Sequence, residues 1–322
     1  MVCRKAARIP DPNWSISGQL NECALLLAEH LIRLQNPPKH TRLHPLVQRL
    51  FDLLPAPSVE TRLDKLFAGR ERSLDWVTAA KRLPAQALLD GFGLHDDTTE
   101  RLITLLDTLV TIMLPGKTVA TVEALNAAAE EACMLVEQQI IRSERLKGLI
   151  RYESNDEMRI VTANMIGLLI QSYDAGCGLL SHGLLYSLRQ RTADYTRLIT
   201  EVLRYDPPVH NTRRILTQSI RLDDAELKAD DSVLLVLAAA NRDPRQFADP
   251  DQFDPQRSNN GEHLTFGAGI HRCLARYYMV QLVVDTLAYV AEQCPGLMLL
   301  TERIEFEPLV NVRLPRSIQI AF

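Results

Sequence analysis

The sequence predicts a mainly α-helical protein with a minor β-part. Apolar residues recur at helical spacing through most of the chain between residues 19 and 189, and again from 274 to 292. β-Branched and apolar runs split by acidic residues follow position 215 and are typical of short strands. From 298 to 322 apolar and polar positions alternate, which predicts two or more further strands.

The helices are expected in a continuous series. Two prolines, Pro37 and Pro38, end the first of them because proline cannot continue the helical hydrogen-bond ladder. The helix expected at 156–189 is apolar nearly all round between Ile160 and Leu188, so it should be buried in the core. The expected helices cover residues 19–34, a segment ending near 54, 58–68, 73–82, 84–92, 98–113, 118–151, 156–189 and 274–292.

The remaining segments are expected to be strands and loops. Residues 215–222 and 232–239 should form a hairpin, and 241–260, which holds three prolines, should be a long ordered loop. Residues 1–18 are rich in proline and polar groups, so we expect them to be loosely structured, without strands.

Composition limits the class of protein. With 322 residues, 46% of them hydrophobic, the chain can bury a large core. A net charge of −4 argues against nucleic acid as the main partner. Six scattered cysteines without a CxxC pair favour a reducing, cytoplasmic location over a disulfide framework or a zinc site. No apolar h-region and no apolar run of ~18 residues is present, so we expect neither a signal peptide nor a membrane anchor.

One short stretch concentrates the chemistry. Residues 266–275 read Phe-Gly-Ala-Gly-Ile-His-Arg-Cys-Leu-Ala and precede an expected helix. The glycines permit a sharply turned backbone that can approach a bulky ligand closely. Because a helix N-terminus favours an anion, Cys273 should be a thiolate more readily than an ordinary cysteine. Such a thiolate is a nucleophile or a metal ligand.

This stretch resembles the haem-binding loop of cytochromes P450, Phe-Gly-x-Gly-x-His/Arg-x-Cys-x-Gly/Ala, at every position. The resemblance implies a P450-like fold, with residues 1–322 as a single haem domain. It also implies heme b as cofactor, with Cys273 as the thiolate ligand of the iron. Phe266, Gly267, Gly269 and His271 would form the cofactor loop.

A second match concerns charged residues. Glu201 and Arg204 lie three apart, so on a helix they share a face. Their context, Glu-Val-Leu-Arg-Tyr-Asp-Pro-Pro-Val, resembles the ExxR helix of the P450 family, and Arg257 matches the arginine that completes a buried triad. The resemblance gives this triad the role of holding the Cys273 loop.

The resemblance also places partners for the haem propionates, which need cations or hydrogen-bond donors. His271 and Arg214 match such positions. The family's His-x-x-x-Arg pattern departs here, because His40 is followed by His44 instead of an arginine. A neutral histidine offers one hydrogen bond but lacks the permanent charge of arginine.

The distal helix departs furthest from the family pattern Ala/Gly-Gly-x-Asp/Glu-Thr-Thr. In one register Ala175-Gly176 is the Ala-Gly pair, so Gly178 and Leu179 replace the acid and the threonine. In the other, which we prefer, Asp174 is the acid that relays protons and the threonine position holds Ala175 or Gly176. Neither register contains a threonine, and Ser172 and Ser181 should point away from the required face.

The function implied is a P450-type monooxygenase that oxidises a small hydrophobic substrate or biosynthetic intermediate with O₂ and external electrons. Arg272 and Arg276 would attract an acidic ferredoxin or flavodoxin, which receives its electrons from a reductase. The missing threonine keeps open a peroxygenase, isomerase or dehydratase, and a degenerate P450-like recruitment domain is a third reading. Substrate specificity is expected in the loops at roughly 10–38, 84–95 and 110–120.

The N-terminal segment, residues 1–39, is shorter than in bacterial P450s. Without the sheet strands that this region supplies in the family, we expect the hairpin at 215–239 to have an open edge. A homodimer partner or a mis-assigned start codon would account for that edge.

Overall fold

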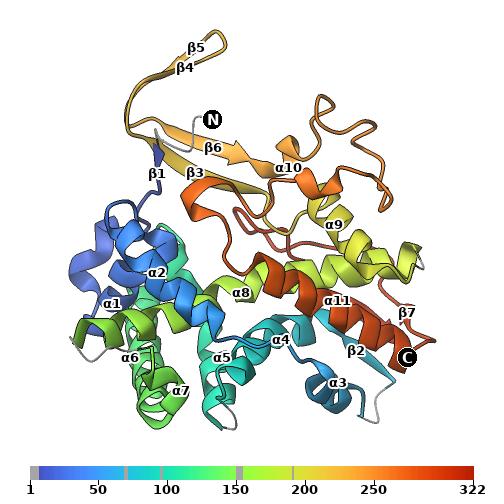
Figure 1. Ribbon diagram of the computed structural model, residues 1–322, viewed down its shortest axis with the longest axis horizontal. Coiled ribbons are helices and arrows are strands. Elements are labelled where there is room, and N and C mark those ends of the chain that lie inside the picture. Colours follow the sequence, from blue (N-terminus) through green and yellow to red (C-terminus); the bar gives the residue numbers. More distant parts are fainter. Residues whose placement is uncertain (1–6, 69–71, 95–96, 150–154, 191) are drawn as a thin grey trace. The chain divides into compact units, whose positions relative to one another are not determined.

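The computed structural model describes residues 7–68, 72–94, 97–149, 155–190 and 192–322 (Figure 1). Helices take up 57% of it, with only small sheets, as the sequence predicted. The chain divides into two compact units, which are described separately. The first unit is Met1–Pro55, Leu88–Tyr173 and Arg214–Val233, and the second is Ala56–Ala87, Asp174–Arg213 and Leu234–Phe322. The prediction of a single domain therefore stays a prediction.

The first unit is built on helices that the sequence anticipated. Helix α1 packs against α6, and α6 packs against α5. Polar caps begin two of them: the side chain of Asn21 accepts a hydrogen bond from the Ala24 N–H, and Thr118 accepts one from Thr121. The elements are η2 (Trp14–Gln19), α1 (Glu22–His30), η3 (Ile32–Leu34), α2 (Lys39–Asp52), α5 (Asp97–Leu109), η4 (Val110–Met113), α6 (Val119–Arg142) and α7 (Glu144–Lys147).

Two expected helices were placed wrongly. Residues 73–82 and 84–92 are one strand and one helix, β2 (Ser73–Asp75) and α4 (Trp76–Gly91), and α4 continues through Pro84. Proline removes one helical hydrogen bond, but Pro84 lies against the bare backbone of Gly176, so packing outweighs that loss. The long helix expected at 118–151 ends at Arg142, where Ser143 caps the separate α7.

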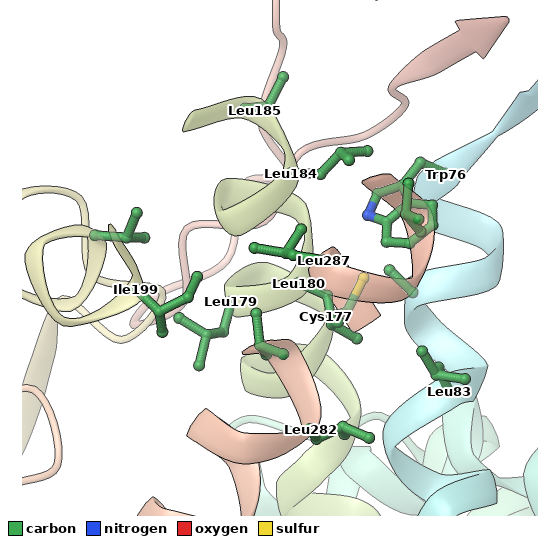
Figure 2. Packing of buried hydrophobic residues seen from close by; sticks show 14 of the residues in the cluster. Trp76, Leu83, Cys177, Leu179, Leu180, Leu184, Leu185, Ile199, Leu282 and Leu287 are labelled. Atoms are coloured by element: carbon green, nitrogen blue, oxygen red, sulfur yellow. The ribbon is translucent and has the colours of Figure 1, made fainter. Parts of the chain in front are cut away.

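The second unit has its core around the C-terminal part of α8 (Asn155–Gln190). Figure 2 shows Leu180 and Leu184 of α8 in one buried cluster with Leu282 and Leu287 of α11 and Trp76 of α4. Gly183 allows this close packing, because a Cβ there would lie 2.9 Å from Ile199. The other elements are α3 (Glu60–Phe67), α9 (Tyr195–Tyr205), α10 (Leu237–Ala240), η5 (Asn260–Glu262), η6 (Gly269–His271) and α11 (Arg276–Gln293).

The sheets differ from the expected hairpin. β3 (Asn211–Leu216) and β6 (Ser232–Val236) lie in a sheet of order β1-β3-β6, while β4 (Ile220–Leu222) and β5 (Ala225–Leu227) form a separate hairpin between them. A third sheet has the order β2-β8-β7, with β7 (Met298–Leu299) and β8 (Gln319–Ala321) at the expected C-terminal strands. Residues 241–260 form the expected loop, apart from the first residue of η5.

The N-terminal segment also departs from its prediction. Residues 1–6 lie outside the described residues, but β1 (Ala7–Arg8) pairs antiparallel with β3, Ala7 opposite Leu216. The expectations of no strand here and of an open edge on the 215–239 segment were therefore wrong at β3. A strand of two residues is too short to show the alternation of apolar and polar residues by which strands are predicted.

Candidate functional site

Residues 266–275, the Cys273 loop, form a turn that is closed by backbone hydrogen bonds. The Cys273 N–H donates to the Phe266 carbonyl at 2.9 Å, and the Gly267 N–H donates to Leu264 at 2.7 Å. Gly267 and Gly269 have φ of +70° and +81°, conformations that favour glycine. A Cβ at Gly267 would meet only the His271 carbonyl, at 4.0 Å, so the loop presents open backbone where a flat ligand could lie.

Cys273 lies three residues before the first residue of α11, as the sequence predicted. The Met279 N–H donates to Ala275 at 2.8 Å, and the Arg276 guanidinium donates to the Cys273 carbonyl at 3.1 Å. The positive end of the helix dipole and this cation both favour a negative charge at the cysteine. The half-buried thiol therefore lies beside the start of α11, and its role as a thiolate stays a prediction.

Two buried polar residues that the sequence analysis missed fasten the loop to α9. The Leu264 N–H donates to Asn241 Oδ1 at 2.7 Å, and Asn241 Nδ2 donates to Thr265 Oγ1 at 2.9 Å. The Thr265 hydroxyl in turn donates to the Leu203 carbonyl on α9. Asn241 directly follows an apolar run, and a polar residue in such a place was the only signal for it in the sequence.

The expected ion cluster is present beneath this connection. Arg204 and Glu201 are fully buried, and their closest atoms, Nη2 and Oε1, are 2.6 Å apart. Arg204 makes five hydrogen bonds, one for each guanidinium N–H, two to Glu201 and three to backbone carbonyls of Asn241, Pro250 and Gln252. Arg257 Nε lies 3.8 Å from Glu201 Oε1. A buried charge is costly unless it is fully partnered, so the segment 241–257 is held firmly to α9.

His263 is a further residue that the sequence did not single out. Burial, and secondarily the charge of Arg272, lower the pKa of His263 from 6.5 to about 4. The ring is therefore neutral at pH 7, and its Nδ1 accepts a hydrogen bond from the Thr265 N–H at 3.2 Å. The ring centroid lies 5.6 Å from that of Phe266, so His263 supports the start of the Cys273 loop.

The long helix α8 has one open face. Between residues 161 and 185, all of which are described, every residue is buried except Gln171, Asp174 and Ala175. These three are spaced i, i+3, i+4 and so form one stripe on the helix surface. We call them the open face of α8. Its place in an otherwise buried helix marks where a ligand could contact α8.

The open face bears on the two sequence registers. Asp174 and Ala175 lie on it, whereas Gly178 and Leu179 are buried. A Cβ at Gly178 would lie 2.9 Å from Pro208, so that position has no room for an acid. The geometry agrees with the register in which Asp174 is the acid and the threonine position holds Ala175 or Gly176, and this register stays a prediction.

No hydroxyl lies on the open face of α8, whose three residues are all described. Ser172 is buried and its hydroxyl donates to the Leu169 carbonyl at 2.9 Å. Ser181 is fully buried beside Cys177. Both therefore point away from the open face, as their spacing predicted.

The other predicted haem contacts are divided between the units. Arg214 on β3 and the histidines of α2 belong to the first unit, and the half-buried His271 of η6 belongs to the second. His40 is buried, 4% exposed, and its ring centroid is 5.7 Å from that of His44. Burial, followed by the proximity of His44, lowers the pKa of His40. The roles of these residues toward propionates stay predictions.

The residues of the second unit fit a planar metal cofactor with one thiolate ligand. They offer a single thiol in a glycine turn, and Phe266 supplies an adjacent aromatic surface. Among the described residues no group of three or more His, Cys, Asp or Glu side chains could hold a metal ion by itself. In the described part of the chain, moreover, no helix is both long and apolar enough to span a membrane.

Comparisons with known proteins agree with this geometry. A family model described as "Cytochrome P450" matches residues 193–277. The chain is 29% identical to cytochrome P450 monooxygenase PikC of Streptomyces venezuelae, over 92% of this chain and 77% of that protein. It is 27% identical to 6-deoxyerythronolide B hydroxylase of Saccharopolyspora erythraea, over 75% of this chain and 65% of that protein.

The fold is likewise similar to solved structures. P450BioI, in complex with acyl carrier protein carrying hexadec-9Z-enoic acid, aligns over 98% of this chain and 87% of its own with a TM-score of 0.82 and 20% identity. CalO2 aligns over 94% of this chain and 82% of its own with a TM-score of 0.80 and 24% identity. Similarity at these identities concerns the fold.

Proposed function

The chain belongs to the cytochrome P450 superfamily, and from that premise we propose that it is a haem-thiolate monooxygenase with Cys273 as the iron ligand. The observation that carries the proposal is the Cys273 loop, a glycine turn at the start of α11 that Asn241 and Thr265 link to the helix of the buried Glu201–Arg204 ion pair. Heme b, when bound, would supply the chemistry of dioxygen activation.

The chain's own residues would bind and orient that cofactor. The thiolate of Cys273 would ligate the iron, and the backbone of Gly267 and Gly269 and the ring of Phe266 would hold the cofactor. His271 would donate a hydrogen bond to a propionate. In the first unit, Arg214, His40 and His44 match the sequence positions of the remaining propionate partners.

On the distal side, Asp174 would hold and pass a proton. It lies on the open face of α8, where a carboxylate can reach water or ligand. Because Ala175 has no hydroxyl, an ordered water or a hydroxyl of the substrate must complete the proton path. This requirement restricts the reaction to substrates or solvent structures that supply that group.

The same feature supports the alternative function. A haem-thiolate enzyme that uses peroxide, or that rearranges or dehydrates its substrate, does not need the alcohol that Ala175 replaces. The second candidate is therefore a peroxygenase, isomerase or dehydratase at the same Cys273 site.

The relatives suggest the class of substrate. One is named for hydroxylating 6-deoxyerythronolide B, another is a methyl-branched lipid omega-hydroxylase, and a third is solved with an acyl group on its carrier protein. We propose a small hydrophobic substrate or biosynthetic intermediate, free or carried by a protein.

We also propose a redox partner and a location. The exposed Arg272, next to the Cys273 ligand, would steer an acidic ferredoxin or flavodoxin with its reductase. A cytoplasmic location rests on the described cysteines, which form no disulfide. A homodimer is compatible with these features.

The test compares two ways of driving the purified haem protein. The probes are hexadec-9Z-enoic acid, myristic acid and testosterone, which occur in complexes of similar structures. Product formation with NADPH, ferredoxin and its reductase, unaffected by catalase, supports the monooxygenase. Product formation with hydrogen peroxide alone supports a peroxygenase. A haem-loaded protein that shifts its spectrum with a probe but oxidises none under either condition contradicts the monooxygenase proposal.

A further inference from the structure

The side chain of Gln171 is the one part of the open face of α8 that the proposed mechanism does not use. It is half-buried, on the same stripe as Asp174 and Ala175, one helical turn before them. This relation follows from the continuous helix α8 alone. The proposed proton path needs an ordered water or a substrate hydroxyl because Ala175 offers no hydroxyl of its own. A polar side chain on the same stripe can form a hydrogen bond with that water or hydroxyl.

The carboxamide of Gln171 is held in one orientation. Its Nε2 donates to the Gly167 carbonyl at 2.9 Å, one turn back along α8. This agrees with the way helical side chains lean toward the N-terminal turn. With one N–H engaged there, the Oε1 acceptor and the second N–H of the amide remain for a further hydrogen-bond partner.

The surroundings of Gly167 explain why the amide can lie there. A Cβ at position 167 would lie 2.1 Å from Leu31 Cδ2, so only glycine admits both Leu31 and the Gln171 amide beside the helix. The segment carrying Leu31 is itself fixed to α8, because buried Asn164 accepts from the Ile32 N–H at 3.1 Å and donates to the His30 carbonyl at 2.9 Å. The amide therefore has a rigid frame on its N-terminal side.

We propose that the Gln171 carboxamide is a positioning residue that orders the water or substrate hydroxyl through which Asp174 delivers protons. The proposal rests on the proposed monooxygenase function. Gln171 itself transfers no proton. Its Oε1 accepts one hydrogen bond and its second N–H donates another, so the bound water or substrate hydroxyl is held in one orientation beside Asp174. The Gln171 amide and the water or hydroxyl that it binds thus take the place of an alcohol side chain on the helix.

The test uses a variant of equal length and a matched control on the same helix. Gln171→Met keeps the length of the side chain and removes both polar atoms. Gln171→Glu keeps an acceptor oxygen. Ser172→Ala removes a side-chain-to-backbone hydrogen bond of the same kind, from Ser172 to Leu169, on the buried side of α8. The wild type and the three variants are prepared with haem, and the haem content and the reduced-CO spectrum of each are recorded first.

Two readouts then decide. The electron paramagnetic resonance spectrum of the resting haem reports the hydrogen bonding of its distal side without turnover. The ratio of hydrogen peroxide released to product formed, with the best probe and the ferredoxin system, reports proton delivery. We expect Gln171→Met to change the resting spectrum and to raise the ratio about tenfold, the effect of about 1.4 kcal/mol. Gln171→Glu should raise the ratio less, and Ser172→Ala should match the wild type.

Two results would overturn the inference while leaving the monooxygenase intact. One is a Gln171→Met protein with the wild-type spectrum and ratio. The other is a Ser172→Ala protein that changes as much as Gln171→Met, since the effect would then come from the helix and not from the amide. A wild-type protein without a thiolate-type CO spectrum would instead overturn the proposed function, and this inference with it.

Discussion

The Cys273 loop and the open face of α8 are built on opposite principles. The loop is tied to α9 by buried hydrogen bonds: Arg204 uses all five of its N–H groups, and Asn241 and Thr265 link the loop to α9. On α8 a helix buried for most of its length leaves three residues open, and none of the three carries a hydroxyl. The loop is fixed by its own chain, whereas the open face depends on what binds to it.

Substitutions in these two regions should therefore have different consequences. Changes in the support of the loop should appear first as lost stability and lost cofactor, because buried charges would be left without partners. Changes on the open face should leave the fold intact and alter turnover, because those side chains carry little of the packing.

Replacing Glu201 tests the support most severely. Glu201→Ala leaves Arg204 buried without its carboxylate, so we expect a loss of about 3–5 kcal/mol in the free energy of unfolding, together with loss of haem. Denaturant unfolding followed by circular dichroism measures it. The matched control is Arg245→Ala, which removes an exposed ion pair with Asp243 and should cost less than about 1 kcal/mol. Equal effects for the two variants would contradict a special role for the buried cluster.

His263 gives the support a pH dependence of defined sign. Its pKa is about 4 in the folded protein and 6.5 when unfolded, so the unfolded chain binds the extra proton between these values. Stability should therefore fall as the pH drops from 6.5 to 4, by on the order of 3 kcal/mol from this residue, and level off below. The His263→Gln variant keeps a hydrogen-bond acceptor but does not titrate, so the part of the stability loss that His263 causes between pH 6.5 and 4 should disappear. The same pH slope in both proteins would show that another group causes it.

Asp174→Asn tests the open face. The fold and the haem spectrum should be unchanged, while ferredoxin-supported turnover should fall about a hundredfold, the scale of a lost general acid. Peroxide-supported turnover should fall much less, because the peroxide already carries the protons. Both rates are measured on the same preparation. A comparable fall in both would place Asp174 in substrate binding instead of proton delivery.

Ala175→Thr should have the smallest effect. The residue is half-buried on the open face, so a hydroxyl fits there without filling the core. We expect an increase of about two- to threefold in product per electron consumed, since one hydrogen bond of about 0.5 kcal/mol supplements the ordered water. An unchanged yield, with normal haem content, would mean that this position does not face the proton path.

The sequence predicted most where chemistry demands particular residues at fixed spacing. The glycines and cysteine of 266–275, and the pair Glu201 and Arg204, have few physical alternatives, and their geometry was found as expected. The buried helix at 156–189 followed from its apolar circumference. In contrast, Asn241, Thr265 and His263 act through tertiary contacts with α9 and the loop, which no local pattern encodes.

The misplaced elements have the same cause. β2 and β1 are very short, and each exists because it pairs with a distant strand, β8 or β3. The continuous α4 passes Pro84 because Gly176 on α8 gives the proline ring a surface to pack on. The open face of α8 was also invisible in the sequence, because its polar members Gln171 and Asp174 resemble isolated polar residues in an apolar run.

The reduced-CO difference spectra of the wild type and of Cys273→Ser decide whether Cys273 is the iron ligand. The wild type should show the Soret band of a thiolate-ligated haem, and Cys273→Ser should lose that band because a hydroxyl cannot replace the thiolate. Absence of the band in the wild type, or the same band in Cys273→Ser, would contradict Cys273 as the iron ligand.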